Sequence, residues 1–455
     1  MNQEDGIMKK YDLIVVGTGS GGSSAAYACR EAGLTVAVID KKPFGGTCAL
    51  RGCDPKKVLV GAAEIMDWIH RMKGLGIEEG SRIHWEDLMM FKRSFTQDVP
   101  ESNEKGYLSA GIDMYHGVAS FLSENEIRIN DDKITFDHLL LAVGAKPAPL
   151  NVKGEEFVFL SDDFLELDHL PKRLVFIGGG FISFEFAHIA ALAGSEVHIL
   201  HRSGAPLKNF DQELVGLLVK RSEELGIHIH LNTVPTLIEQ IEGKYVIHAE
   251  ENGENKEIEC DRVFHGAGRI PDVDDLNLEQ GRVTYNKHGI AVNEFLQSIS
   301  NEKVYAAGDA SASKGLPLTP VAGMESAAVG ANILKGNHKQ ADYAVVPSII
   351  FTQPKLAIIG LTEEKALANG YETIVNRMDT KDWYTFKRTN ESYAMTKTIV
   401  DKKTGKLIGV HILGENADEL INYFTLIMKF DLPYEEVKNT IFAYPSSASD
   451  LGYFL

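Results

Sequence analysis

The chain has 455 residues, 44% of them hydrophobic and 24% charged, a balance that excludes a disordered or fibrous protein. At roughly 150 residues per domain, the length predicts about three domains. The 46 basic and 64 acidic residues give a net charge of −18, which argues against a nucleic acid or an anionic membrane as partner.

From the sequence we expect neither a membrane anchor nor an export signal. No apolar run reaches the roughly 20 residues of a transmembrane helix, and the first ten residues, MNQEDGIMKK, lack the apolar stretch of a secretory signal. Only four cysteines occur, too few for a disulfide scaffold, and Cys29 and Cys260 each stand alone in apolar segments typical of a core. We therefore expect a cytoplasmic protein, in which a close cysteine pair is redox-active or metal-binding.

One pattern occurs twice, at residues 11–41 and 173–202. Each copy is a short apolar run, a glycine-rich turn, a helical stretch closed by a glycine, and a second apolar run, which is typical of a βαβ unit. The sequence therefore predicts an α/β fold with two Rossmann-like dinucleotide-binding domains.

The first copy carries the pattern Gly17-x-Gly19-x-x-Gly22 between the apolar run LIVV and a helical stretch. Its first glycine permits a tight turn, the second lets the backbone approach a pyrophosphate, and the third lets helix and strand pack closely. Asp40 ends the second strand, where a carboxylate binds a ribose hydroxyl. The alternative is a glycine-rich turn without a ligand, but strand, helix and acid together favour a dinucleotide.

Two cysteines follow this unit, in the segment GGTCALRGCDPKK of residues 45–57. In a regular helix Cys48 and Cys53 would be separated by about 7.5 Å along the axis, whereas a disulfide needs Cα atoms within about 7 Å. The segment must therefore be a distorted helical turn, which Gly52 permits. A thiol at a helix N-terminus or near the lysines that follow should have a lowered pKa. The alternatives are a zinc half-site, for which no second Cys/His pair is evident, and two inert thiols; we predict no metal site.

The second copy has the related pattern GGGFIS at residues 178–183, in which serine replaces the third glycine. No acid follows it: His201 occupies the position equivalent to Asp40, Arg202 comes next, and Lys208 lies six residues further on. A carboxylate would repel a 2′-phosphate, whereas an arginine would pair with it. The sequence therefore predicts NADPH rather than NADH, the alternative being a solvated basic loop.

The rest of the chain divides by pattern. Helical periodicity between about 58 and 110 separates the two copies, and glycine-bounded strands follow the second one. From about 343, strands alternate with amphipathic helices, which indicates a separate C-terminal α+β domain. The predicted division is a first dinucleotide domain of residues 1–149 and 270–342, a second of 150–269, and a C-terminal domain of 343–455.

Together these features resemble the FAD-dependent pyridine nucleotide–disulfide oxidoreductases, the group that includes glutathione reductase, dihydrolipoamide dehydrogenase and mercuric reductase. The resemblance runs from about Lys9 through nearly the whole chain. It includes five further segments, which are AVGA at 142–145, GAGR at 266–269, AGD at 307–309, LTPVA at 318–322 and FTQP at 351–354. It implies that the three predicted domains bind FAD, bind NADPH and form a homodimer, in that order.

The resemblance also assigns roles to residues of this chain. FAD would be held by Gly17, Gly19, Ser20, Gly21, Gly22, Asp40, Thr47, Gly144, Asp309 on the ribityl chain, and Thr319 at the start of a helix. NADPH would be contacted by Gly178, Gly179, Gly180, Ile182, Arg202, Lys208 and Gly268. Lys56 would lie beside the flavin N5 and pair with Glu185. Cys53 would be the thiol next to the flavin, and Cys48 the thiol that attacks the substrate.

The implied reaction is a relay from NADPH through the flavin to a Cys48–Cys53 disulfide. The Cys48 thiolate would then attack an incoming disulfide, and Cys53 would resolve the mixed disulfide. We expect a small disulfide as substrate, as in glutathione reductase.

The chain departs from the family near its C-terminus. Disulfide reductases of the family usually carry a His-Pro-Thr segment there, and this His acts as general acid in the partner subunit's active site. Here Tyr444 stands in place of the His, within YPSSASD, and Ser449 stands in place of a Glu. A tyrosine with a pKa near 10 is a poor proton shuttle at neutral pH.

Three explanations stay open. Tyr444 donates a hydrogen bond to a special disulfide, or the acceptor needs no protonated leaving thiol, or another histidine serves, although His411 reads as a packed strand residue. The leading hypothesis is an NADPH-dependent reductase of a small disulfide. The alternatives are a reductase of a quinone or a metal ion, a dihydrolipoamide dehydrogenase-like component of a larger complex, and a catalytically silent flavoprotein sensor. Mercuric ion is disfavoured because the C-terminal DLGYFL lacks the cysteine pair of mercuric reductases.

Overall fold

A computed structural model describes residues 9–78 and 80–454 of the chain. The first eight residues, on which the argument against a secretory signal partly rests, lie outside the described residues. The chain divides into two compact units, each built from three segments. The first unit contains the residues up to Pro55, Arg93–Ala148 and Arg269–Tyr343, and the second contains Lys56–Lys92, Pro149–Gly268 and the residues from Ala344 on.

The first unit therefore corresponds to the predicted FAD domain without its helical segment 56–92. The second unit contains the other two predicted domains together with that segment. The finer division into three domains stays a prediction.

The first unit is built on a sheet with the strand order β3-β2-β1-β6-β5-β4, in which β18 also pairs with β6. Its strands are β1 (Lys9–Val16), β2 (Val36–Asp40), β3 (Asp113–His116), β4 (Ala119–Ser123), β5 (Glu126–Ile129), β6 (Asp132–Leu141) and β18 (Val304–Ala306). The pairs among β3, β2, β1, β6 and β18 are parallel, and β4, β5 and β6 pair in antiparallel fashion. This is the doubly wound arrangement that the repeated βαβ pattern predicts.

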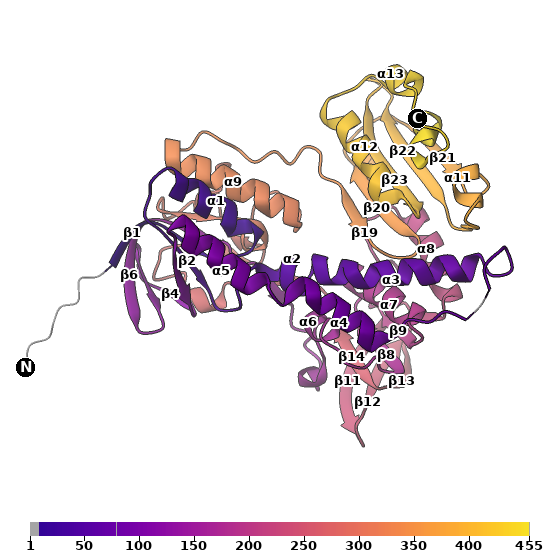
Figure 1. Ribbon diagram of the computed structural model, residues 1–455, viewed down its shortest axis with the longest axis horizontal. Helices are drawn as coiled ribbons and strands as arrows, with labels where there is room; N and C mark the ends of the chain where they lie inside the picture. The colour runs from indigo at the N-terminus through magenta and orange to yellow at the C-terminus, as the bar shows by residue number, and fades with distance from the viewer. Residues whose placement is uncertain (1–8, 79, 455) are drawn as a thin grey trace, which may run out of the picture. The chain divides into compact units, whose positions relative to one another are not determined.

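Helices and short elements complete this unit. They are α1 (Ser20–Glu31), α2 (Gly46–Arg51), α5 (Val99–Ala110), α9 (Thr319–Lys335), β7 (Ala145–Pro147), β15 (Arg269–Pro271), β16 (Tyr285–Asn286), β17 (Gly289–Ile290), η2 (Asp274–Leu276) and η3 (Gly308–Ala310). Helices α1 and α9 lie side by side (Figure 1). Residues of β1 alternate between two cores: Leu13 and Val15 face α1 and α9, while Ile14 and Val16 face the opposite core.

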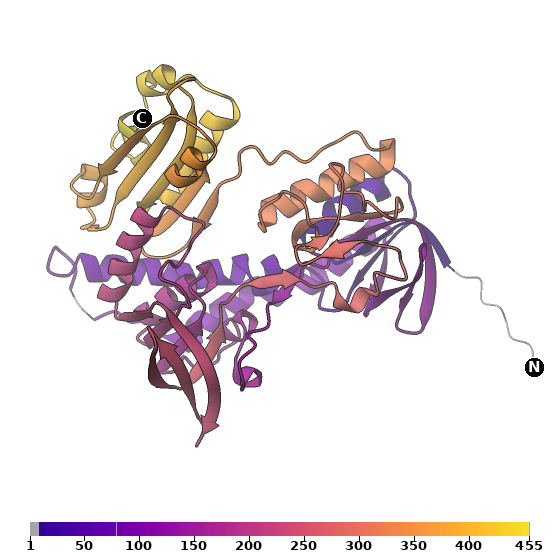
Figure 2. The ribbon, with the colours of Figure 1, turned by 180° about the vertical axis from the view of Figure 1, so that it is seen from behind.

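The second unit contains a parallel sheet of order β10-β9-β8-β14, which we call the nucleotide sheet, and an antiparallel sheet of order β11-β12-β13. Its strands are β8 (Arg173–Ile177), β9 (Glu196–Leu200), β10 (Ile227–His230), β11 (Thr233–Ile241), β12 (Lys244–Glu251), β13 (Glu254–Cys260) and β14 (Arg262–His265). One face of the nucleotide sheet packs with residues of α3 (Cys53–Arg71), α7 (Phe181–Leu192) and α8 (Gln212–Glu224), and the other packs with β11–β13. Figure 2 shows β11–β13 as a long twisted ribbon.

The C-terminal part of the second unit is a five-stranded antiparallel sheet of order β19-β20-β23-β22-β21. Its strands are β19 (Ser348–Ile350), β20 (Lys355–Gly360), β21 (Thr373–Asp379), β22 (Met395–Asp401) and β23 (Leu407–Gly414). Helix α12 (Ala417–Lys429) packs its apolar side on β20 and β23 (Figure 1). The smaller helical elements of this unit are α4 (Trp85–Thr96), which runs on into the first unit, η1 (Glu155–Phe157), α6 (Ser161–Phe164), α10 (Glu363–Ala368), α11 (Tyr384–Lys387), α13 (Tyr434–Asn439), η4 (Ser447–Asp450) and α14 (Leu451–Phe454).

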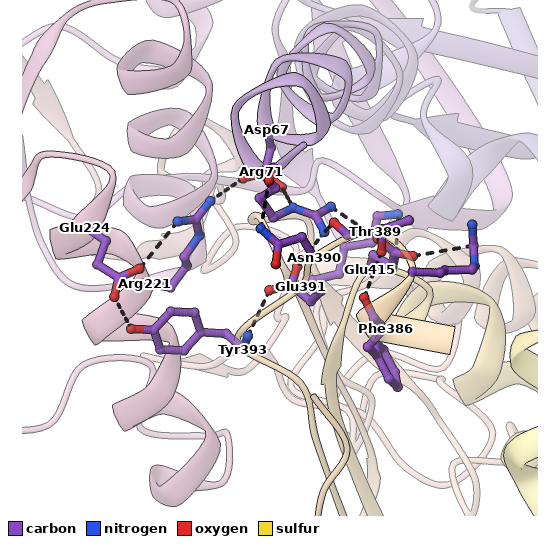
Figure 3. Close-up of polar contacts among 12 residues, drawn as sticks. Asp67, Arg71, Arg221, Glu224, Phe386, Thr389, Asn390, Glu391, Tyr393 and Glu415 are labelled. Atoms are coloured by element: carbon purple, nitrogen blue, oxygen red, sulfur yellow. Dashed lines mark hydrogen bonds and ion pairs between the residues drawn. The ribbon is translucent and has the colours of Figure 1, made fainter. Parts of the chain in front are cut away.

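A buried ionic network joins distant segments within the second unit (Figure 3). At the end of α3, Arg71 donates from Nε to Asp67 at 2.7 Å and from Nη2 to Glu415 at 3.1 Å, and Glu391 lies 3.6 Å from its Nη1. Arg221 of α8 donates to the other oxygen of Asp67. Arg71 and Asp67 belong to α3, Arg221 belongs to α8, and the other two carboxylates belong to the C-terminal segment. The network therefore fixes α3 and α8 to the C-terminal segment. Among the described residues, no helix is long and apolar enough to cross a membrane.

Candidate active site

The two cysteines lie on either side of a break between two helices. Cys48 is in α2, which ends at Arg51, and α3 begins at Cys53. Gly52 interrupts the helix with φ −145° and ψ −115°. A Cβ atom at Gly52 would lie 2.9 Å from the Thr47 carbonyl oxygen and 3.3 Å from the Cα of Cys48, too close for any other residue. The prediction of a distorted helical turn is confirmed.

The break brings the two thiols within hydrogen-bonding distance of each other. The hydrogen bond with Cys53 is the main cause that raises the pKa of Cys48, and burial raises it further. Thr319 is the first residue of α9, and its hydroxyl lies 3.5 Å from the Cys53 sulfur. A hydrogen bond from Thr319 lowers the pKa of Cys48 and so partly offsets these two effects. The expectation of a lowered thiol pKa is therefore wrong for Cys48 in this state, because the neighbouring thiol stabilises its protonated form. Cys29 and Cys260 are fully buried, as expected for core residues.

The first glycine pattern forms a tight cradle in the first unit. Gly17 has φ +108°, and a Cβ there would lie 2.2 Å from the Ala142 carbonyl oxygen. Gly19 is the N-cap of α1, and no side chain caps that helix end. Since the first N–H groups of a helix lack partners within it, this end suits a phosphate. Asp40, at the end of β2, accepts hydrogen bonds at one oxygen from the Thr18 N–H and hydroxyl, at 2.9 and 2.7 Å.

The predicted ribityl-binding aspartate lies beside the start of α1. A Cβ atom at Gly308 would lie 4.0 Å from the Cα of Gly21, so η3, which contains Asp309, sits against this helix end. Burial raises the pKa of Asp309, although the positive charge of Arg269 partly offsets this. Among the described residues, no side chain or backbone group is recorded as a hydrogen-bond partner of its carboxylate. A partly buried acid of this kind, beside a glycine cradle, fits a polyhydroxylated ligand such as the ribityl chain of FAD.

The other predicted FAD residues also lie in the first unit. Ser20, Gly21 and Gly22 are in α1, Thr47 is in α2, Gly144 lies between β6 and β7, and Thr319 begins α9. The structure thus gathers the predicted FAD residues in one unit, except Lys56.

Lys56 lies in the second unit, where its Nζ is 2.7 Å from the Glu185 carboxylate of α7. The Glu185 side chain is 1% exposed, and its second oxygen accepts a hydrogen bond from the Phe351 N–H at 2.9 Å. The structure therefore brings this predicted pair together and holds the carboxylate in place from two sides. Their catalytic role remains a prediction.

The second glycine pattern opens α7, with Gly180 as its N-cap and Ile182 in its first turn. The Gly179 N–H donates to His201 Nδ1 at 3.1 Å, the same type of contact that Thr18 makes with Asp40 in the first unit. With Nδ1 as acceptor, Nε2–H of His201 donates to the Ala205 carbonyl oxygen at 3.1 Å. Burial lowers the pKa of His201, so a neutral imidazole occupies the position of the acid.

Two cations flank this imidazole. Arg202 and Lys208 are both exposed, and no ion pair with either is recorded among the described residues. Both contribute to lowering the pKa of His201. The remaining predicted nucleotide contacts are Gly178, in the turn before α7, and Gly268, in the turn before β15. Both have positive φ angles.

Tyr444 lies in the C-terminal part of the second unit and is 81% exposed. No hydrogen bond of its hydroxyl is recorded among the described residues. His411, the alternative histidine, is 1% exposed, and burial lowers its pKa to about 4, so it is the packed strand residue that the sequence predicts.

Sequence reasoning missed Glu325, a buried carboxylate of α9. It accepts hydrogen bonds from the Gly308 N–H, the Ser313 hydroxyl and the Tyr343 hydroxyl, each at 2.6 Å. These bonds fix the turn that carries Asp309. A single acid among small residues in the segment AGMESAAVG was the only signal for it.

With this geometry established, comparison with known proteins identifies the class. Residues 11–326 match the family model described as pyridine nucleotide-disulphide oxidoreductase, and residues 346–452 match the dimerisation domain of that family. The chain therefore belongs to the pyridine nucleotide-disulphide oxidoreductases. The recognised resemblance is confirmed, and so is the fold class of two Rossmann-like dinucleotide-binding domains with a C-terminal α+β dimerisation domain.

The chain is similar to proteins with different acceptors. It is 32% identical to a mercuric reductase of Staphylococcus aureus, over 97% of this chain and 81% of that protein. It is 30% identical to a glutathione reductase of a Nostoc species, over 97% of this chain and 98% of that protein. Among solved structures, the Cu(II) complex of the HOCl-induced flavoprotein disulfide reductase RclA from Escherichia coli matches with a TM-score of 0.88 and 25% identity, covering 98% of this chain and 99% of that one.

These relatives establish the chain as an FAD-dependent oxidoreductase of the disulfide family that takes electrons from a pyridine nucleotide. The dimerisation domain supports a homodimer.

Proposed function

We propose that this chain is an NADPH-dependent flavoprotein reductase that passes electrons from NADPH through FAD to a Cys48–Cys53 disulfide and on to a small disulfide substrate. The observation that carries the proposal is the break at Gly52, at which the Cys48 and Cys53 thiols come within hydrogen-bonding distance of each other. A regular helix would keep them apart. Metal-free thiols in this arrangement suit reversible disulfide exchange.

FAD, when bound, would supply the transfer of an electron pair between the nicotinamide and the disulfide. The cradle at Gly17 and the uncapped start of α1 would bind its pyrophosphate, and Asp40 and Asp309 its hydroxyl groups. Glu325 would position Asp309 through the Gly308 N–H. Lys56, held in place by its ion pair with Glu185, would place an ammonium hydrogen-bond donor beside the flavin.

The reduced thiols would then carry out two exchange steps. The Cys48 sulfur, as a thiolate, attacks one sulfur of the substrate disulfide, and the other leaves as a thiolate that takes up a proton. The Cys53 thiolate next attacks the Cys48 sulfur, releases the second substrate thiol and restores the Cys48–Cys53 disulfide. The pKa of Cys48 is raised in the dithiol state, so this thiol tends to keep its proton. Cys48 must therefore lose the proton before its sulfur can attack the substrate.

The preference for NADPH rests on charge near the second glycine pattern. A neutral His201 replaces the usual carboxylate, so nothing there repels a 2′-phosphate. Arg202 and Lys208 are exposed cations on the following loop, and arginine binds phosphate in a bidentate manner.

Two observations favour a second candidate acceptor, which is a metal ion or a quinone. Tyr444 replaces the histidine that protonates a leaving thiol, and it is largely exposed, with no hydrogen bond of its hydroxyl among the residues that the structure describes. Similar chains are named mercuric reductase, and the similar RclA was solved as a Cu(II) complex. In the proposed homodimer, Tyr444 of each chain would complete the active site of the other.

The test is NADPH oxidation by the purified holoenzyme with a panel of acceptors: glutathione disulfide, other small disulfides, a quinone, and mercuric and cupric ions. Cys48→Ser should abolish turnover of a disulfide, whereas Cys29→Ala, which alters a buried core thiol, should leave it intact. Turnover confined to the quinone or the metal ions would contradict disulfide reduction and favour the second candidate.

A further inference from the structure

A group of imidazoles and carboxylates lies at the edge of the nucleotide sheet. It contains no residue of either glycine pattern. Strands β9 and β10 run parallel, and their register pairs His198 with His228. The two rings stack with centroids 4.6 Å apart. Glu196 lies two residues before His198 and therefore on the same face of the strand. One ligand atom from each of these three residues lies within 4.8 Å of the other two.

This spacing is close to what a single metal ion requires. Zinc holds nitrogen and oxygen ligands at about 2.0–2.2 Å, so two ligands of one ion are at most about 4.4 Å apart. Small side-chain rotations would close the difference. The three residues are partly or fully exposed, so an ion has access from solvent and one coordination position remains for water.

Neighbouring groups orient the carboxylate and the central ring. Arg173 Nε lies 3.0 Å from one oxygen of Glu196, and the other oxygen is 3.1 Å from His198 Nε2. His198 Nδ1 is 3.0 Å from His230 Nε2, and His230 Nδ1 is 3.0 Å from Glu251. A histidine that binds a metal through one nitrogen commonly bonds through the other to such a chain ending in a carboxylate.

This chain of hydrogen bonds has two possible directions. When Glu251 accepts from His230 and His230 accepts from His198, the Nε2 of His198 has a lone pair that faces the Glu196 oxygen, and a cation must lie between them. In the other direction Lys256, whose Nζ is 2.9 Å from His230 Nδ1, donates to His230, and His198 donates to Glu196. The second direction suits the metal-free protein and the first suits the metal-bound one.

We propose that Glu196, His198 and His228 bind one divalent transition-metal ion, and that His230 and Glu251 position the ring of His198 for it. Two imidazole nitrogens with one carboxylate oxygen, and no thiolate, suit Zn²⁺, Ni²⁺ or Cu²⁺ rather than Cu⁺. Cys48 and Cys53 belong to the first unit, so the proposed metal site shares no residue with the thiol pair. The sequence alone does not predict this metal site, because its ligands come together only through the register of two strands.

The experiment measures Zn²⁺ bound to the FAD-loaded protein after equilibrium dialysis against buffered free Zn²⁺. The starting protein carries Cys48→Ser and Cys53→Ser, so that no redox thiol binds the ion. We expect one Zn²⁺ per chain. His198→Ala and His228→Ala should each weaken binding at least about 100-fold, and Glu251→Gln about 10–100-fold, since outer partners of metal ligands have effects of that size.

The matched control is His248→Ala. His248 lies on the neighbouring β12 and also contacts two carboxylates, but its Nε2 faces Glu239 at 3.0 Å and its Nδ1 faces Glu257 at 3.1 Å. Its two nitrogens therefore cannot direct both acids to one ion. Flavin content and melting temperature confirm that each variant folds.

Loss of Zn²⁺ in the His198 and His228 variants, with binding retained in the His248 variant, supports the site. Undiminished binding in either ligand variant, or an equal loss in the His248 variant, overturns it. Undiminished binding in Glu251→Gln alone overturns the positioning role of that residue.

Discussion

The ionic network of the second unit offers a direct test of the packing described above. Arg71 has a side chain that is 6% exposed and contacts three carboxylates: Asp67, one turn earlier in α3, and Glu391 and Glu415 from the C-terminal segment (Figure 3). The substitution Arg71→Met keeps the length of the apolar stem but removes the charge. The three carboxylates then stay buried but lose their contact with the Arg71 guanidinium.

Removing one partner of a buried ion pair costs about 3–5 kcal/mol, because the remaining charge stays desolvated. Among Arg71's partners, the side chains of Asp67, Glu391 and Glu415 are at most 5% exposed, so water cannot readily replace the guanidinium. At about 2 °C per kcal/mol for a folding unit of this size, we expect the melting temperature to fall by roughly 6–10 °C.

Tryptophan fluorescence is the suitable probe, since all three tryptophans, Trp68, Trp85 and Trp383, belong to the second unit. The control is Lys105→Met, which breaks the exposed pair with Glu101 and should leave the transition unchanged. A fall below about 2 °C in Arg71→Met would refute the reasoning that this buried cation holds α3 to the C-terminal segment.

Three further predictions concern specificity, pH and the missing general acid. Arg202→Ala should lower kcat/KM for NADPH by about 10–150-fold and leave that for NADH nearly unchanged, because a bond to a charged group contributes about 1.5–3 kcal/mol; equal losses with both nucleotides would contradict it. Burial raises the pKa of Glu391 from 4.5 to about 7. Between those values the folded state keeps a proton that the unfolded state releases, so this contribution to stability is present at low pH and is lost as the pH rises through 7. Glu391→Gln should flatten the melting temperature between pH 5 and 8, and an unchanged slope would count against it. Tyr444→His should raise the turnover of glutathione disulfide at least tenfold, as general acid catalysis contributes about 10²–10⁴-fold, and no gain would show that the tyrosine is not what limits this reaction.

The sequence predicts the parts of the structure that local rules determine. The repeated βαβ pattern follows from apolar periodicity and from glycines such as Gly17, which need a positive φ angle. The break between α2 and α3 follows from the spacing of two cysteines around Gly52. Both are properties of short segments, so a single sequence contains enough information for them.

What the sequence does not predict depends on side chains from separate segments. Glu325 bonds to Gly308, seventeen residues earlier, and nothing local marks it as a positioning residue. The raised pKa of Cys48 depends on the neighbouring thiol and on burial. Neither can be predicted from secondary-structure propensities or from sequence motifs. The pairing of His198 with His228 depends on the register of two strands. Contacts of this kind need the fold itself.

The most direct test of the central claim is an anaerobic reductive titration of the FAD-loaded protein. If Cys48 and Cys53 form a redox disulfide, the wild type takes up two electron pairs per flavin, one for FAD and one for the disulfide. Cys48→Ser should take up only one. Uptake of a single pair by the wild type, with no change in Cys48→Ser, would contradict a thiol relay in this protein.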